Sequence, residues 1–196
     1  IGAHKGESIE YFKIIYPEAI IYSFEPISDN YNVLIEKSKL FEGSCFTYNM
    51  AVAECSGYLN FYCQDISHIG SLLKINIDSK DSLGYASKAK NKKTKVPVIS
   101  IDDFCAEHNI DQVDLVKIDV QGYEEKVLEG AIKSINKINC FIIEISFYDF
   151  YEHYSSLFHI ENILESTHKI WDISKISKNP KNLRTDWVEI VYRKRK

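Results

Sequence analysis

Short runs rich in β-branched and aromatic residues alternate with stretches of helical spacing along most of the chain. This alternation is typical of an α/β fold with a mostly parallel sheet. The runs expected to form strands are 19–26, 46–54, 57–63, the first part of 96–110, 112–122, 139–146, 168–174 and 186–194. Helices are expected over 28–41, the second part of 96–110, 123–135 and 148–165.

The last two expected strands follow one another without a helix between them. The segment that joins them, 175–185, is rich in turn-forming residues. Two consecutive strands at the end of an alternating chain predict an antiparallel hairpin that closes a parallel sheet. Because 196 residues with 45% hydrophobic content can bury one full core, residues 1–196 are expected to form a single domain.

Composition narrows the classes of partner and compartment. The formal net charge of −4 gives no general attraction to nucleic acids or anionic membranes. The stretch "CFIIEIS" is too short to span a bilayer and contains Glu144, so it reads as a buried strand. Five widely spaced cysteines without a C-x-x-C pair favour free thiols in a reducing compartment over disulfides or zinc. We therefore expect a cytoplasmic protein without a metal site.

One segment is strongly biased in charge. Residues 88–95 contain five lysines. A solvated loop is the simpler interpretation, and an electrostatic guide for an anionic substrate is the alternative.

The chain begins with "IGAHKG", in which Gly2 and Gly6 occur where a strand would pass into a helix. Glycine at such a point lets backbone N–H groups approach a ligand. Nineteen residues after Gly6, at the end of the next expected strand, is Glu25. Rossmann-type folds place an acid at about this distance to accept hydrogen bonds from ribose hydroxyls. The loop and Glu25 together predict a nucleotide-type cofactor site.

Two further acids end neighbouring strands. Asp119 ends the apolar run "LVKID", and Glu144 lies near the end of "FIIEIS". Ligands of α/β folds bind at the carboxyl edge of the sheet, and an unpaired buried charge is costly, so neither acid is readily explained as core. The two acids form either a paired structural network or a set that faces a cofactor and a substrate.

These motifs together resemble the FkbM family of methyltransferases. The blocks "IGAHKGES", "YSFEPISDNYNVL", "NMAVAECSGYLNFY", "GSLL", "ISIDDF", "LVKIDVQGYEEKVLEGA" and "FIIEIS" occur in that family's order and spacing. The resemblance implies a class I, Rossmann-like methyltransferase fold with helices on both faces of the sheet and a reversed C-terminal hairpin. It also implies S-adenosylmethionine as cofactor and O-methylation of a hydroxyl on a sugar, a glycan or a secondary metabolite.

The resemblance further implies roles for individual residues. Gly2, Ala3 and Gly6 would line the methionine moiety of the cofactor, Glu25 would hold the ribose, Asn49 and Ala51 would lie near the adenine, and Asp119 would face the sulfonium. His4 and Pro26 belong to the same cofactor-binding set. His4 and Gln121 depart from the family, which more often has Asn and Glu at these positions.

Methyl transfer to an alcohol requires a group that accepts the hydroxyl proton. Asp119 is the first candidate for this base and Glu144 the second. His4 and His68 are the histidines expected closest to the site, although a lone histidine is more often a surface or structural residue.

Two other functions remain open from sequence. A glycine loop followed by an acid also fits an NAD-dependent oxidoreductase, although the third glycine of G-x-G-x-x-G is absent. An inactive cofactor-binding domain is the second alternative.

The resemblance also implies that an apolar strand precedes Ile1, so that the chain is an N-terminally truncated domain lacking most of its first strand. That strand would lie between the strands that end at Glu25 and Asp119. Its loss would expose unpaired backbone groups, so the 196 residues alone are expected to be unstable or to recruit a substitute strand, and to bind cofactor poorly.

Overall fold

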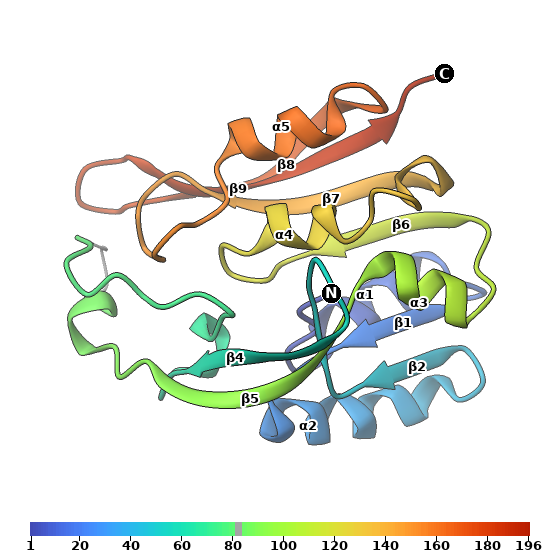
Figure 1. Cartoon of the computed structure of the whole chain (residues 1–196), viewed down its shortest axis with the longest axis horizontal. Helices are drawn as coiled ribbons and strands as arrows, with labels where there is room; N and C mark the ends of the chain where they lie inside the picture. The colour runs from blue at the N-terminus through green and yellow to red at the C-terminus, as the bar shows by residue number, and fades with distance from the viewer. Residues whose placement is uncertain (81–83) are drawn as a thin grey trace.

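Three hydrogen-bonded sheets form in the computed structural model, which describes residues 1–80 and 84–196 (Figure 1). Their strands are β1 (Ile21–Phe24), β2 (Cys45–Tyr48), β3 (Ala51–Val52), β4 (Gly57–Cys63), β5 (Lys92–Ile99), β6 (Val113–Ile118), β7 (Ile138–Ser146), β8 (His168–Lys178) and β9 (Thr185–Lys194). The α-helices are α1 (Glu7–Ile15), α2 (Ser28–Ser38), α3 (Ile101–Glu107), α4 (Glu124–Glu129) and α5 (Leu157–Leu164). Short 3₁₀ turns occupy Lys39–Phe41, Ser67–Ile69, Ala86–Lys88 and Ile135–Lys137.

The sheets are mixed, so the expected mostly parallel sheet is correct only in part. Crossover connections give the parallel pairs β1 with β2, β3 with β5, and β6 with β7. The pairs β4 with β5, β7 with β9, and β8 with β9 are antiparallel. The difference arises because β4 runs back along β5, and because the C-terminal hairpin adds two strands to β7.

The predicted C-terminal hairpin is confirmed. Strands β8 and β9 pair antiparallel, and β9 lies between β7 and β8 in the order β6-β7-β9-β8. This order places residues from the far end of the chain beside β6 and β7. The hairpin thereby becomes one wall of the cleft described below.

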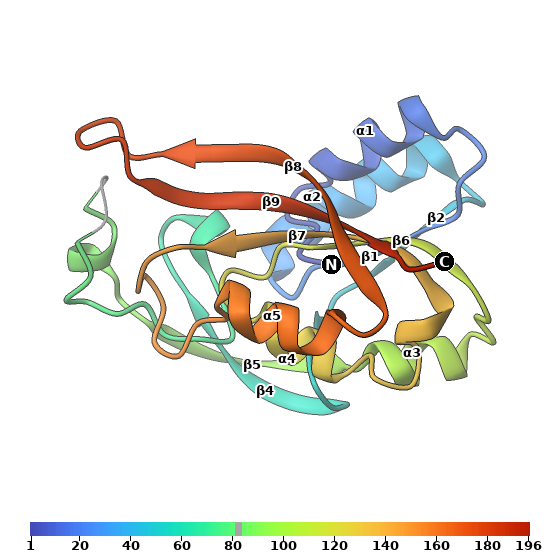
Figure 2. The same ribbon diagram turned by 90° about the horizontal axis from the view of Figure 1, so that it is seen from above.

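Helices cover both sides of the strand layer, with α3, α4 and α5 on one side and α1 and α2 on the other (Figure 2). The larger core lies between β6, β7 and β9 and the helices α3 to α5. Its fully buried side chains include Ile118, Leu128, Phe141, Ile143 and Leu164. Apolar residues that alternate along β7 and β9 and recur at helical spacing in α4 and α5 supply this core.

Two expected strands are altered. The run 46–54 divides into β2 and β3, because the chain bends at Asn49 and Met50 between them. Strand β6 is less buried than its apolar run suggests, and only Ile118 in it is fully buried. Its residue Lys117 borders the cleft.

Two expected helices are shorter than predicted. Helix α4 ends at Glu129, and the rest of the expected helix consists of turns and the start of the 3₁₀ turn Ile135–Lys137. The expected helix 148–165 begins only at Leu157, where Ser156 and His159 form a capping box.

The lysine-rich segment is in part a strand. Strand β5 begins at Lys92, and the side chains of residues 92–95 are exposed. The expectation of a solvated segment is correct for these residues, whereas the expectation of a loop is wrong for them.

Residues 1–3 lie between β1 and β6. The Ile1 nitrogen donates to the Lys117 carbonyl oxygen at 2.8 Å, and the Asp119 N–H donates back to the Ile1 carbonyl oxygen at 3.2 Å. On the other side, the N–H groups of Gly2 and Ala3 donate to the Phe24 carbonyl oxygen at 3.1 and 2.9 Å. The first residues therefore join the ends of two strands that do not pair with each other.

Gly2 is required for this close approach. Its φ of +73° lies in the left-handed region, and a Cβ there would lie 1.9 Å from the Asp119 carbonyl oxygen. Gly43 provides a matched comparison, because its φ is +80° and nothing lies within 4 Å of the place that a Cβ would take.

We expect Gly2→Ala to lower the free energy of unfolding more than Gly43→Ala does. Both variants incur about 1 to 2 kcal/mol of left-handed strain. Gly2→Ala adds a clash with backbone, for which we expect a further loss of about 1 to 3 kcal/mol. Urea denaturation of both variants measures the difference, and equal losses would show that the approach of Gly2 to Asp119 is not a constraint.

Candidate functional site

A cleft of about 670 Å³ opens where β1, β3, β6 and β7 end. Glu25 follows β1, Asp119 follows β6, and Glu144 lies near the end of β7. The cleft extends along the hairpin, where β8 and β9 contribute further side chains. Its volume is within the range of small-molecule sites, and its position at the carboxyl ends of parallel strands is the usual ligand position in α/β sheets.

Glu25 anchors the N-terminal loop at one end of the cleft. Its carboxylate accepts hydrogen bonds from the N–H groups of His4 at 2.9 Å and Ile27 at 3.0 Å, and from the Asn30 side chain at 3.3 Å. Burial raises the pKa of Glu25, although these three hydrogen bonds act in the opposite direction. Glu25 thus holds the loop in place and also forms part of the cleft wall.

Most of the residues expected to contact a cofactor line this cleft. They are Gly2, Ala3, His4, Glu25, Pro26, Ala51 and Asp119. Gly6 and Asn49 are not among the lining residues. Gly6 is the N-cap of α1 and lies close to Leu34 of α2, and Asn49 donates to the Glu25 carbonyl oxygen at 2.9 Å. Both residues therefore support the loop without lining the cleft.

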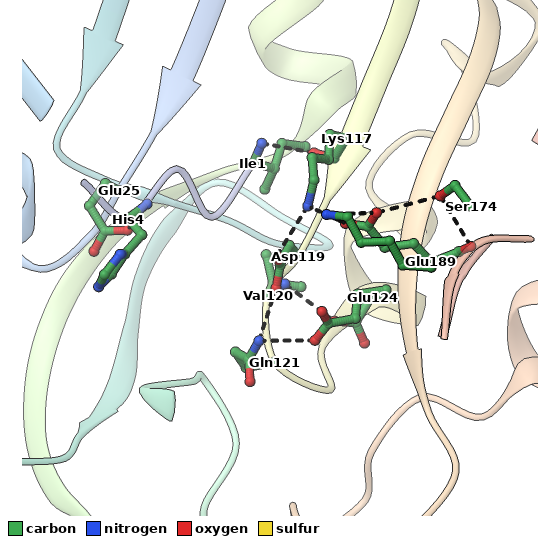
Figure 3. Close-up of polar contacts among 12 residues, drawn as sticks. Ile1, His4, Glu25, Lys117, Asp119, Val120, Gln121, Glu124, Ser174 and Glu189 are labelled. Carbon is green, nitrogen blue, oxygen red and sulfur yellow. Dashed lines mark hydrogen bonds and ion pairs between the residues drawn. The ribbon is translucent and has the colours of Figure 1, made fainter. Parts of the chain in front are cut away.

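Gln121 connects the two predicted catalytic acids. Its side-chain nitrogen donates to Asp119 at 2.9 Å and to Glu144 at 3.2 Å. Asp119 also accepts a hydrogen bond from the Lys117 ammonium at 3.1 Å, so each of its two carboxylate oxygens has a donor (Figure 3). Among the described residues, no donor contacts the second oxygen of Glu144.

The backbone around Gln121 is held from several sides. Gln121 has a φ of +60°, in the left-handed region. Its carbonyl oxygen accepts from Ser71 at 2.8 Å, and its side-chain oxygen contacts the Tyr151 hydroxyl at 3.0 Å. The buried Glu124 carboxylate accepts from the N–H groups of Val120 and Gly122. This local network fixes the amide that bridges the acids.

A chain of alternating charges continues from Asp119 to the hairpin. Lys117 contacts both Asp119 and Glu189, at 3.1 and 3.2 Å, and Glu189 also contacts Lys175 of β8 at 3.2 Å. Sequence reasoning assigned no role to Lys117 and missed Glu189. The sequence does show Glu189 as a charged residue inside the apolar run "WVEIV". Its role could not be inferred from this run, because Lys117 and Lys175, which it contacts, belong to other strands.

Burial and neighbouring charges shift the ionisation of this cluster. Burial, reinforced by the negative charges of Asp119 and Glu124, raises the pKa of Glu144 to about 8. Burial also raises the pKa of Glu124 to about 7. Burial alone would lower the pKa of Lys117, but the carboxylates of Asp119 and Glu189 outweigh it and raise this pKa. Glu144 therefore carries a proton at a pH where ordinary carboxyls have lost theirs.

Acidic side chains outnumber basic ones along the cleft. The lining carboxyls are those of Glu7, Glu25, Asp119, Glu144, Asp186 and Glu189, and the lining lysines are Lys117, Lys175 and Lys178. His4 and His68 also line the cleft; the His4 ring contacts Glu7 at 3.2 Å, and the His68 ring lies against Tyr85. The arrangement suits a ligand with positive charge more than one with several negative charges.

Among the described residues there is neither a cluster that could bind a metal nor a helix that could span a membrane. Within 1–80 and 84–196, no group of three or more His, Cys, Asp or Glu side chains is arranged to hold a metal ion. The cysteines at 45, 55, 63, 105 and 140 are free thiols. In the same part of the chain, none of the helices combines the length and apolar character that crossing a bilayer demands.

Comparison with known families identifies one match. The family model described as the methyltransferase FkbM domain matches residues 1–170. No solved structure matches the chain significantly.

Two curated proteins are similar to the chain. One is the hexuronic acid methyltransferase AglP of Haloferax volcanii, 24% identical over 128 residues, which cover 65% of this chain and 48% of that protein. The other is the 2-O-methyltransferase NoeI of Sinorhizobium fredii, 23% identical over 163 residues, which cover 78% of this chain and 64% of that protein. The aligned part of the chain thus spans about half to two thirds of the length of these relatives.

We expect Glu144→Gln to flatten the dependence of stability on pH. An unfolded Glu releases its proton near its ordinary pKa of 4.5, whereas folded Glu144 keeps it up to about pH 8. Within this window the folded state therefore binds more protons than the unfolded state. The contribution of Glu144 to the free energy of unfolding consequently falls as pH rises, by at most about 1.4 kcal/mol per pH unit. The variant removes this loss.

Urea denaturation between pH 5 and pH 8, a window set by that shift, measures the effect. Glu36→Gln, on the exposed side of α2, is the control and should leave the slope unchanged. Part of the slope remains in Glu144→Gln because Glu124 titrates in the same direction. A slope identical to that of the unmodified protein would contradict the raised pKa of Glu144.

Proposed function

The chain belongs to the FkbM methyltransferase domain family, and on that premise we propose that it transfers a methyl group from S-adenosylmethionine to a hydroxyl of a sugar, a glycan or another small molecule. The proposal treats residues 1–196 as one class I methyltransferase domain. The names of the two relatives support this acceptor class, because one is a hexuronic acid methyltransferase and the other a 2-O-methyltransferase. The observation that carries the proposal is the acid-rich cleft in which Gln121 joins Asp119 and Glu144.

The N-terminal half of the cleft fits the cofactor. The backbone of Gly2 and Ala3 forms part of its wall, and the N–H groups of both residues are held by the Phe24 carbonyl oxygen. Glu25, Pro26 and Ala51 continue this wall. These residues would hold S-adenosylmethionine, with the carboxylate of Glu25 toward the ribose.

The charges favour a sulfonium cofactor over a dinucleotide. A pyrophosphate commonly binds at the N-terminus of the first helix, where N–H groups and the helix dipole attract anions. In this chain the Glu7 carboxylate lies at that end of α1 and accepts from the Lys5 N–H at 3.2 Å. A second anion there would be repelled, and this argues against the NAD-dependent oxidoreductase.

S-adenosylmethionine, when bound, supplies an electrophilic methyl group, and the protein supplies alignment and removal of the hydroxyl proton. Glu144 is the better proton acceptor of the two predicted acids. Its raised pKa makes its carboxylate a stronger base, and its second oxygen has no donor among the described residues. Asp119, held by Lys117 and Gln121, is then the acid that faces the positive charge.

Gln121 acts on this base through position and charge. An amide donates a hydrogen bond to each acid without adding a negative charge between them. A glutamate at this position would add a third acid and raise the cost of ionising Glu144.

Calorimetry tests the cofactor assignment. We expect S-adenosylmethionine to bind more tightly than NAD, and we expect Glu25→Ala to weaken cofactor binding by about 1 to 3 kcal/mol, the usual loss for hydrogen bonds to a charged group. Glu36→Ala, on the exposed side of α2, is the control and should bind as the unmodified protein does. Tight NAD binding without any response to S-adenosylmethionine would overturn the proposed function, and unchanged affinity in folded Glu25→Ala would overturn the ribose assignment.

Transfer of labelled methyl to a panel of sugars and glycosides, measured across pH, tests the base. We expect kcat/KM to rise with pH through about 8 as Glu144 loses its proton. Glu144→Gln should abolish that rise and lower the rate by about 10² to 10⁴. Asp119→Asn should lower the rate but keep a rise with pH. If Glu144→Gln retains the profile and Asp119→Asn loses it, Asp119 is the base.

A further inference from the structure

The hairpin wall of the cleft carries side chains that neither the cofactor nor the proton acceptor explains. Trp187 of β9 is paired across the sheet with Ser146 of β7 on one side and with Ser177 of β8 on the other. Residues paired in this way point to the same face of a sheet, and all three line the cleft. They form a row of one indole flanked by two hydroxyls.

A second row lies two residues along the same strands. Glu144 of β7, Glu189 of β9 and Lys175 of β8 are paired across the sheet in the same manner. Two residues along a strand correspond to about 7 Å. A ring placed against Trp187 would therefore present its edge to Glu144, the proposed proton acceptor.

The indole of Trp187 differs from the other tryptophan of the chain. Trp171 is 57% exposed, and its ring is covered by Lys169 and Arg193 as cation–π partners. Trp187 is half-buried, and within residues 1–80 and 84–196 no aromatic or cationic side chain stacks on its ring. Its indole is a rigid apolar surface in the cleft wall.

We propose that this wall is the acceptor subsite and that it binds a pyranose sugar whose C–H face stacks on Trp187. The C–H groups on one face of a sugar ring carry partial positive charge and are attracted to the negative face of an indole. The hydroxyls at the ring edge lie near Ser146 and Ser177 beside the indole and near Glu144 in the next row. A phenol would stack as well, but its single hydroxyl could not bond to both serines and Glu144, whereas a sugar carries several hydroxyls.

The inference rests on the proposed function, because it names the substrate class of the same site. It makes Trp187 a binding residue that the reaction chemistry alone does not require. It also orients the sugar, since the stacked ring presents a hydroxyl toward Glu144.

Saturation-transfer NMR on the protein tests the subsite without requiring turnover. The probes are methyl β-D-glucopyranoside, methyl β-D-glucuronide and, for comparison, catechol. We expect saturation to reach the C–H protons on one face of the glycoside ring. Trp187→Ala should weaken the apparent affinity roughly tenfold, and Trp187→Phe should weaken it less because it keeps a ring. Trp171→Ala, the matched control, should bind both glycosides as before.

Thermal denaturation establishes that each variant is folded. If Trp187→Ala does not fold, Trp171→Phe leaves Trp187 as the single tryptophan, and both glycosides should then change its fluorescence in a saturable way. The corresponding Trp187→Phe protein, which retains only Trp171, should give no such change.

Three results would overturn the subsite: absence of saturation on both glycosides, equal binding by folded Trp187→Ala, or tighter binding of catechol than of either glycoside. Calorimetry with S-adenosylmethionine separates this failure from that of the proposed function. Cofactor binding without glycoside contact at Trp187 would overturn this inference alone. Glycoside contact at Trp187 in a protein that does not bind S-adenosylmethionine would confirm a sugar subsite and overturn methyl transfer.

Discussion

The backbone of residues 1–3 connects the ends of β1 and β6, and the arrangement of the cleft depends on it. Ile1 exchanges hydrogen bonds with Lys117 and Asp119, and Gly2 and Ala3 both donate to Phe24. These contacts set the separation between the acid that follows β1 and the acid that follows β6. Because Gly2 lies against the Asp119 carbonyl, a side chain at this position would push the two strand ends apart.

The same strand ends gather more carboxyls than a protein interior tolerates without partners. Lysines compensate part of this charge, since Lys117 and Lys175 contact Glu189 and Lys117 also contacts Asp119. Glu144 is compensated differently. It has a neutral amide beside it and a pKa raised to about 8, which makes its carboxylate form a stronger base than an ordinary carboxylate. A group in that state is suited to accept a proton from a substrate.

The cleft also has two chemically different ends. Main-chain atoms and Glu25 line the N-terminal end, whereas Trp187 and cross-strand serines line the hairpin end. The bridged acids lie where the two ends meet. Such a division suits a reaction between two bound molecules, because alignment of the pair is the main contribution that a methyl-transfer enzyme makes.

Local pattern in the sequence was sufficient for the strand-and-helix alternation, the C-terminal hairpin and the positions of Glu25, Asp119 and Glu144 at strand ends. Period-two and helical spacing depend on near neighbours, and an acid that ends an apolar run is visible without knowing the partner strand. Tertiary structure decided the mixed sheets, the break between β2 and β3, and the support roles of Gly6 and Asn49. It also decided that Glu189 and Trp187 share a wall with Glu144, because the register between β7 and β9 brings together residues more than 40 positions apart, and no local spacing records that register.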